Sequence, residues 1–118
     1  MNDATTDPAM VSRWWALWPE ANIGLNLKTA GLVVVDCDRH DPAVDGVENF
    51  KRLLEKLGLA DLKTACVMTG GGGQHWYFRL PSAVQFKGAL GPGIDIKANG
   101  YVILPPSVHI SGLSYVWI

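Results

Sequence analysis

Residues 32–38 read Leu-Val-Val-Val-Asp-Cys-Asp, and we expect the fold to be organised around this stretch. A run of β-branched residues without Pro or Gly predicts a buried central strand. Because side chains alternate along a strand, Asp36 and Asp38 should lie on one face and Cys37 on the other. The sequence therefore predicts a hydrophobic strand that ends in two carboxylates on the same side of a sheet.

The two carboxylates have two interpretations. Their Cα atoms are expected roughly 6.6 Å apart, so both side chains can reach one divalent cation or a pair of cations. Mg²⁺ or Mn²⁺ would remove the repulsion between Asp36 and Asp38, because these ions prefer oxygen ligands and keep open positions for substrate phosphates. The alternative is that both residues only end the strand and begin the loop at residues 39–42. The pattern Asp-x-Asp is too short to decide between them.

Length and composition limit the class of protein. A chain of 118 residues predicts a single domain over residues 1–118, and 48% hydrophobic with 18% charged residues is typical of a folded chain. The apolar runs are far shorter than the roughly 20 residues of a membrane helix, and no signal peptide is recognised, so no membrane partner is expected. Two cysteines outside a Cys-x-x-Cys pair favour a reducing, cytoplasmic setting. A net charge of −1 indicates that any binding of nucleic acid is local, mediated by a metal, or supplied by another segment.

A first helix is predicted between the cap Asp7 and the breaker Pro19. It carries Trp14 and Trp15, with Trp18 one turn further on. We expect these indoles to pack against a sheet, and the alternative is that they stack on nucleic-acid bases.

The rest of the chain predicts an α+β fold, with a mostly antiparallel sheet and flanking helices. Three hairpins are expected, pairing residues 23–27 with 32–38, 64–69 with 74–80, and 94–97 with 101–104. A second helix is expected over residues 45–57, where Asp45 and Glu48 resemble a capping box. Residues 87–93 are expected to form a loop, and residues 115–117 to begin a last strand.

The strand at residues 74–80 predicts a second group of functional side chains. Alternation places His75, Tyr77 and Arg79 on one face, next to the four glycines of residues 70–73. Open backbone N–H groups, an imidazole and a guanidinium are suited to holding phosphates. The alternative is a loose hairpin tip with a surface histidine. The glycines are not a Walker motif, because no Gly-Lys-Ser/Thr follows them.

A further carboxylate, Asp95, stands between two isoleucines in the strand predicted at residues 94–97. It shares a face with Lys97. Desolvation disfavours an unpaired charge at such a position. We therefore expect Asp95 to pair with a metal or with Lys97.

Taken together, four motifs in this order resemble the bifunctional primase-polymerase (Prim-Pol) domain of the archaeo-eukaryotic primase superfamily. They are Asp-Cys-Asp at 36–38, Gly-Gly-Gly-Gly-Gln-His at 70–75, Gly-Ile-Asp-Ile-Lys at 93–97 and Pro-Pro-Ser-x-His at 105–109. The resemblance covers nearly the whole chain. It implies a catalytic core related to the RNA-recognition-motif fold and template-directed nucleotidyl transfer, as DNA primase or DNA polymerase, in plasmid, phage or prophage replication.

The resemblance also implies roles for individual residues. Asp36, Asp38 and Asp95 would bind the catalytic Mg²⁺ or Mn²⁺ ions of a two-metal mechanism, and His75 would contact the incoming triphosphate. We expect further basic side chains to offset phosphate charge, and a serine and a histidine to act as secondary phosphate contacts or as structural residues: Arg79, Lys97, Ser107 and His109. The implied partners are nucleoside triphosphates, a DNA template and primer, and a helicase segment or subunit.

Two departures from the family qualify these expectations. Members carry a further N-terminal segment with a strand, so we expect a core that lacks this strand, as a piece of a larger replication protein. The zinc-binding stem of some relatives has no counterpart here. Two other functions stay open: a metal-dependent nuclease or phosphodiesterase that uses the same carboxylates, and a non-catalytic module that binds nucleotides or nucleic acid.

Overall fold

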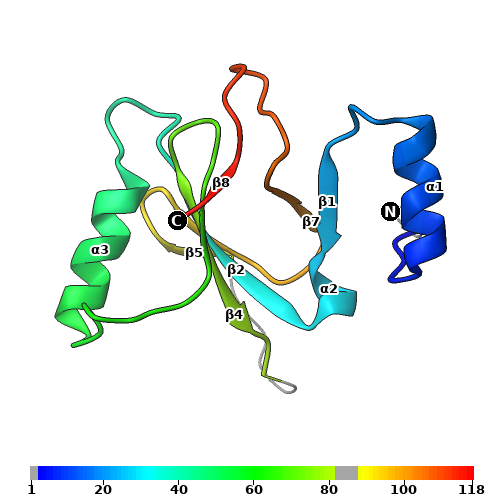
Figure 1. Cartoon of the computed structure of the whole chain (residues 1–118). Helices are drawn as coiled ribbons and strands as arrows, with labels where there is room; N and C mark the ends of the chain where they lie inside the picture. Colours follow the sequence, from blue (N-terminus) through cyan, green and yellow to red (C-terminus); the bar gives the residue numbers. More distant parts are fainter. Residues whose placement is uncertain (1–2, 82–87) are drawn as a thin grey trace.

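The β-branched run is strand β2 (Leu32–Cys37) of the computed structural model, which describes residues 3–81 and 88–118. Among these residues, β2 lies inside a six-stranded antiparallel sheet with the order β5-β6-β2-β4-β3-β8 (Figure 1). The other strands are β3 (Cys66–Met68), β4 (Gln74–Arg79), β5 (Ala89–Gly91), β6 (Ile94–Lys97) and β8 (Val116–Trp117). Antiparallel sheets with few helices confirm the predicted α+β class.

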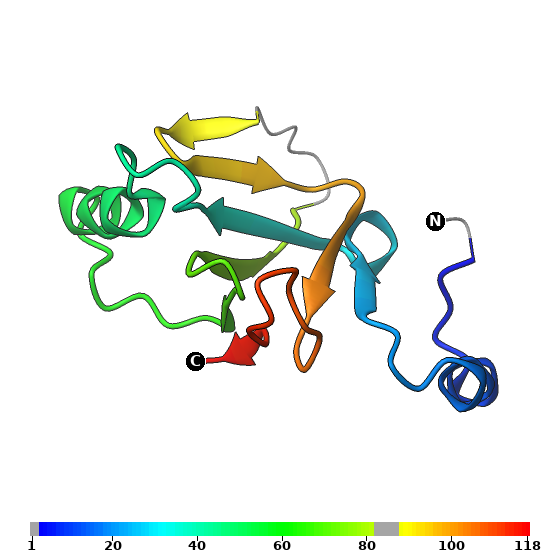
Figure 2. The same cartoon turned by 90° about the horizontal axis from the view of Figure 1, so that it is seen from above.

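A second sheet covers part of one face of the large sheet. In the described residues it has two antiparallel strands, β1 (Ile23–Asn26) and β7 (Tyr101–Leu104). Figure 2 shows β7 running across the direction of β2. Leu27 and Val102 pack there against Val34 and Tyr77 of the large sheet, and all four side chains are buried. This contact forms the first of two hydrophobic clusters.

Helix α3 (Gly46–Lys56) covers the opposite face of the large sheet (Figure 1). Asp45 caps it by accepting the backbone N–H of Glu48 at 3.0 Å, which confirms the predicted helix and its cap. Phe50 and Leu54 pack on this face in the second hydrophobic cluster, together with Val35, Cys37 and Ile94. The two faces of β2 therefore serve two different layers, as alternation requires.

The predicted hairpin between residues 23–27 and 32–38 is wrong. Strand β1 pairs with β7, and a single helical turn, α2 (Leu27–Ala30), connects β1 to β2. The side chain of Asn26 caps this turn by accepting the N–H of Thr29 at 3.2 Å. Gly31 ends it at a φ of +66°, in the left-handed region that glycine tolerates. The chain is thereby redirected from the small sheet into the large one.

The predicted hairpin between residues 94–97 and 101–104 is also wrong. Strand β6 pairs with β2 on one side and with β5 on the other. After the turn at Asn99 and Gly100 the chain leaves the large sheet, and the carbonyl of Gly100 accepts the N–H of Leu27 at 3.0 Å. Strand β5 lies in the region predicted as a loop, of which residue 87 is outside the described residues. The hairpin of β3 and β4 and the final strand β8 are confirmed.

Helix α1 (Pro8–Leu17) begins at its predicted cap, where Asp7 accepts the N–H of Ala9 at 3.0 Å. No residue of α1 is fully buried, but Trp14 and Trp15 are half-buried and line a hollow with residues of β1. Trp18, just after the helix, is 60% exposed, so the predicted packing of the tryptophans against a sheet is partial. The helix lies beside the small sheet (Figure 1), and the hollow that both line includes Ile23, Leu25 and Leu104 of that sheet. Within the described residues, none of the helices, α1 included, combines the length and hydrophobicity of a membrane-spanning segment.

Candidate active site

Asp36 lies at the centre of a row of polar side chains across the large sheet. In the strand register it is opposite His75 of β4 on one side and opposite Asp95 of β6 on the other. Directly opposed residues of antiparallel strands share a face. Three residues predicted from separate stretches of sequence therefore share one face of three adjacent strands.

The carboxylate of Asp36 has two basic partners. The ammonium of Lys97 donates to its Oδ2 at 2.7 Å, and Nε2 of His75 lies 3.3 Å from its Oδ1. Burial alone would raise the pKa of Asp36, but the hydrogen bonds with His75 and Lys97 outweigh burial and lower this pKa below its ordinary value. Asp36 is therefore held as a carboxylate, which is the form that binds cations and basic groups.

Asp38 follows the end of β2 and is fixed through its backbone. Its N–H donates to the carbonyl of Gly93 and its carbonyl accepts from Gly46, both at 2.8 Å. Its side chain accepts the N–H of Arg39 at 2.7 Å and contacts the imidazole of His40. The hydrogen bond with Asp38 raises the pKa of His40 above its ordinary value. Each of the two carboxylates therefore has a protein base as its partner.

Both carboxylates line one cavity of about 210 Å³. The cavity also brings together three other predicted site residues, His75, Lys97 and His109. The rest of its lining comes from the loop after β2, the glycine turn, strand β7 and the C-terminal segment: Cys37, His40, Thr69, Gly71, Tyr101, Val102, Ile103 and Tyr115. Segments far apart in sequence thus meet around Asp36.

Three predicted site residues are absent from this lining. Asp95 lies on the neighbouring strand β6, opposite Asp36 in register, but it is exposed and does not line the cavity. Arg79 lies at the other end of β4, opposite Leu32, and is exposed. Ser107 is 5% exposed, and its hydroxyl accepts the N–H of Ile23 at 2.7 Å. Ser107 therefore ties the C-terminal segment to β1.

The glycine turn between β3 and β4 packs tightly beside the cavity. A Cβ on Gly73 would lie 2.4 Å from the carbonyl oxygen of Cys37, and one on Gly70 would lie 2.2 Å from Cβ of His109. These approaches exclude side chains at both positions. The close contact argues against the alternative of a loose hairpin tip. It also holds His109 beside the turn, where His109 lines the cavity.

Two buried polar atoms beside Asp36 lack hydrogen-bond partners among the described residues. They are Nδ1 of His75 and the hydroxyl of Tyr77. Buried polar groups are nearly always paired, because an unpaired one costs about 1–3 kcal/mol. Burial raises the pKa of Tyr77 to about 12, so its hydroxyl stays protonated at neutral pH. The face of the sheet that carries Asp36 therefore has two buried polar atoms that form no hydrogen bond within the described residues.

Sequence reasoning missed three side chains that shape the cavity: His40, Tyr101 and Tyr115. His40 is two residues after Asp38, and its position in the loop was the only available signal. The tyrosines gave none, because they approach Asp36 only after β7 crosses the sheet. Tyr115 lies with its ring centre 6.3 Å from that of His75 and 6.1 Å from that of His109.

The donor chemistry of Asp36 and Asp38 fits a hard divalent cation, since both offer carboxylate oxygens to one cavity. In the described part of the chain, no three His, Cys, Asp or Glu side chains come together closely enough to hold a metal ion. Lys97 and His40 occupy the carboxylates instead. The role of Asp95 as a third ligand therefore stays a prediction.

A polar cavity lined by carboxylates and basic groups, on an antiparallel α+β sheet, offers partners to both cations and anions. The family model described as bifunctional DNA primase/polymerase, N-terminal, matches residues 1–118. The chain belongs to this family, which confirms the resemblance found in its sequence motifs. No curated protein and no solved structure matches it.

Proposed function

We propose that the cavity around Asp36 carries out template-directed nucleotidyl transfer, as a DNA primase or DNA polymerase acting in intracellular DNA replication. The observation that carries the proposal is the meeting of Asp36, Asp38, His75 and Lys97 at one cavity in a chain of the primase-polymerase family. Two acidic and two basic side chains can serve a reaction in which charge builds on phosphate oxygens.

Asp36 and Asp38 would hold Mg²⁺ or Mn²⁺, with Asp95 as the third carboxylate. When bound, the cation supplies charge neutralisation and activation of the attacking 3′-hydroxyl. Asp36 is suited to this role because its pKa is lowered and its side chain is 19% exposed. A carboxylate that is partly buried and ionised can exchange one cationic partner for another without first losing a proton.

Lys97 and His75 would then serve the triphosphate. The side chain of Lys97 is 43% exposed, so its ammonium can turn from Asp36 towards a phosphate oxygen beside it. Within the described residues, Nδ1 of His75 forms no hydrogen bond, so this imidazole has capacity for one more. Because hard cations prefer oxygen to imidazole, His75 is assigned to phosphate and not to metal. His109 and His40, at the same cavity, are secondary candidates for phosphate contact.

A labelled primer annealed to a template tests the proposal. We expect extension that requires both a divalent cation and deoxynucleoside triphosphates, and that is lost in Asp36→Asn. Asp61→Asn is the matched control, because Asp61 is an exposed carboxylate outside the cavity. Shortening of the primer without nucleotides would support the nuclease. Nucleotide binding by calorimetry without incorporation at any metal concentration would support the non-catalytic module.

A further inference from the structure

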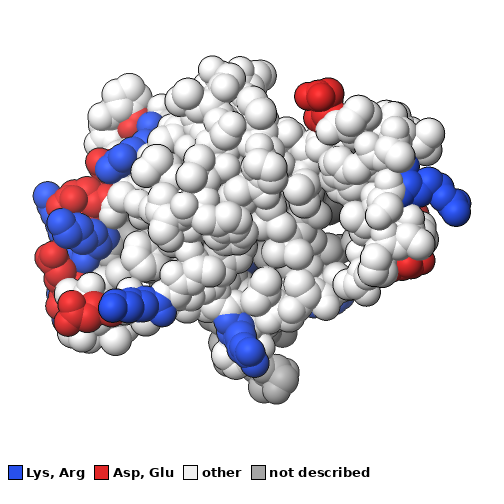
Figure 3. All heavy atoms as spheres, viewed as in Figure 1, with Lys and Arg blue, Asp and Glu red and all other residues white. Residues whose placement is uncertain are grey.

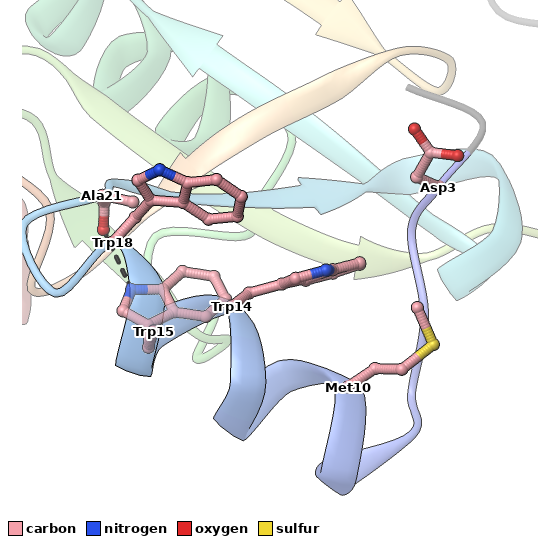
Figure 4. Close-up of a pocket in the computed structure, with 6 residues that line it drawn as sticks. All are labelled: Asp3, Met10, Trp14, Trp15, Trp18 and Ala21. Atoms are coloured by element: carbon pink, nitrogen blue, oxygen red, sulfur yellow. Dashed lines mark hydrogen bonds between the residues drawn. The ribbon is translucent and has the colours of Figure 1, made fainter.

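Helix α1 and the residue after it present an aromatic surface that the fold covers only in part. Met10 and Trp14 are four residues apart on one side of α1, and Trp18 is the residue at its C-terminal cap. They line a pocket of about 480 Å³ with Asp3, Trp15 and Ala21. Figure 4 shows the indole rings projecting from α1 into this pocket. Trp18 is 60% exposed, so a large aromatic surface is left open to solvent.

This surface is continuous with the candidate active site. Trp14 also lines a second hollow, of about 330 Å³, whose opposite side includes Tyr101 of β7. Tyr101 in turn lines the cavity around Asp36 and is 52% exposed. Its ring rests beside Gly24, where a Cβ would be 3.4 Å from the ring. Trp18, Trp14 and Tyr101 therefore form a path, the aromatic track, from the end of the molecule to the cavity.

The chemistry of the aromatic track favours unpaired bases. Every base has a π face that can stack on an indole or a phenol, and such stacking tolerates any sequence. In a duplex these faces are already covered. The one charged residue lining either hollow of the described structure is Asp3, which would keep phosphates at the solvent side.

Charge alone would not hold a nucleic acid on this side of the molecule. Figure 3 shows that charged side chains gather mainly over α3, whereas the middle of the viewed surface is largely uncharged. The net charge of the chain is −1. Stacking must therefore supply most of the local affinity, which exposed tryptophans can do.

We propose that Trp18, Trp14 and Tyr101 form a track on which a single-stranded nucleic acid stacks as it approaches the candidate active site. The identity of this strand as the template rests on the proposed function. Its binding to the track does not.

Fluorescence anisotropy with labelled oligothymidylate tests the track. Trp18→Ala should raise Kd by roughly 5- to 150-fold, the loss of one stacked base, and Trp18→Phe should restore most of the affinity. Leu17→Ala is the matched control, because Leu17 lies on the same helix, is 62% exposed and lines neither hollow. Competition by unlabelled duplex should be weaker than competition by single strand.

Three results would overturn the track. They are absence of oligothymidylate binding by the wild type, equal effects of Trp18→Ala and Leu17→Ala, and equal loss in Trp18→Phe and Trp18→Ala. The alternative occupant of this surface is a second copy of the chain, and sedimentation at several protein concentrations tests for such a dimer. A wild-type dimer that Trp18→Ala dissociates, with oligothymidylate affinity unchanged, would assign the surface to a second copy of the chain.

Failure of the track and failure of the proposed function can be told apart. Asp36→Asn should bind oligothymidylate normally while losing incorporation. If the wild type extends primers and Trp18→Ala changes neither Kd nor the template KM, the track is wrong and the function stands. If no protein extends primers but Trp18→Ala loses oligothymidylate, the track stands and the function is wrong.

Discussion

The two faces of the large sheet differ in how completely they are covered. On one face, Phe50 of α3 packs edge-to-face on Trp76, with ring centres 5.3 Å apart, and Cys37 is fully buried. On the other face, the small sheet covers Val34, and a cavity remains between strand β7 and Asp36. The same strand supplies both faces. Packing under α3 gives stability, and the cavity on the other face leaves a place where charged groups can meet a ligand.

The comparison leads us to expect that substitutions on the helix face change stability and that substitutions on the cavity face change function. On the helix face the described contacts are apolar, so their loss costs burial and packing. On the cavity face the carboxylate of Asp36 is already paired within the protein with Lys97 and His75. Because the side chain of Lys97 is 43% exposed, solvent screening keeps the contribution of its pair with Asp36 to stability small. The predictions below separate the two faces.

The largest effect is expected for Asp36→Asn. Metal-dependent incorporation should fall by roughly a thousandfold or more, because a ligand worth several kcal/mol of transition-state stabilisation is lost. The free energy of unfolding should change little, since the amide fills the same space. Primer extension and urea unfolding measure the two quantities. A variant that unfolds, or that keeps wild-type incorporation, would assign Asp36 to the framework.

Phe50→Ala should give the reverse result. Phe50 is 4% exposed, so its truncation should lower the free energy of unfolding by about 3–5 kcal/mol. Incorporation per folded molecule, measured well below the unfolding transition, should stay near the wild-type value. Lys51→Ala, on the exposed side of the same helix, is the control. If Phe50→Ala lost activity while remaining folded, the two faces would not be separable.

His75→Ala should act on nucleotide binding. The KM for the nucleoside triphosphate should rise by the equivalent of about 1.5–3 kcal/mol, one charge-assisted hydrogen bond. Mn²⁺ affinity measured without nucleotide should be nearly unchanged, and a large loss would move His75 into the metal shell. Arg79→Ala is the comparison on the same strand, outside the cavity. An equal rise in KM would return Arg79 to the nucleotide site.

The last prediction concerns the pH dependence of stability, where Asp36 and Cys37 should act at opposite ends. The pKa of Asp36 is lowered from 3.8, so its stabilisation is present above that value and is lost as the pH falls below it. Burial raises the pKa of Cys37 from 9.0 to about 12, so its stabilisation is present below pH 9 and is lost as the pH rises towards 12.

Thermal unfolding across the pH range measures both limbs. Asp36→Asn should flatten the acid limb and leave the alkaline one, and Cys37→Ala should do the opposite. Profiles that change together in both variants would contradict independent faces.

Sequence reasoning succeeded where the deciding contacts are local. The cap of α3 depends on Asp45 and Glu48, three residues apart, and the hairpin of β3 and β4 depends on the glycines between them. The alternation of β2 predicted that Cys37 enters the core. These features depend on periodicity and turn chemistry, which neighbouring residues carry. For the same reason, alternation correctly placed Asp36 and His75 on the polar faces of their strands, which the register brings opposite each other.

Strand pairing between distant segments could not be predicted from local sequence patterns. Strand β1 pairs with β7 and not with β2, the next strand in sequence, because a capped helical turn ending at Gly31 separates β1 from β2. The exposure of Trp18 was also missed, since an apolar stripe on a helix predicts burial without saying whether a partner surface exists.

By itself, the sequence determined the α+β class, the buried strand with its two terminal carboxylates, and membership of the primase-polymerase family through motifs in a fixed order. Only the tertiary structure decided that Lys97 and His75 pair with Asp36, that Tyr101 and Tyr115 close the cavity, and that Arg79 and Ser107 stay outside it. The physical reason is that alternation fixes the face of a side chain, whereas its neighbours depend on strand order and on which segments cover that face.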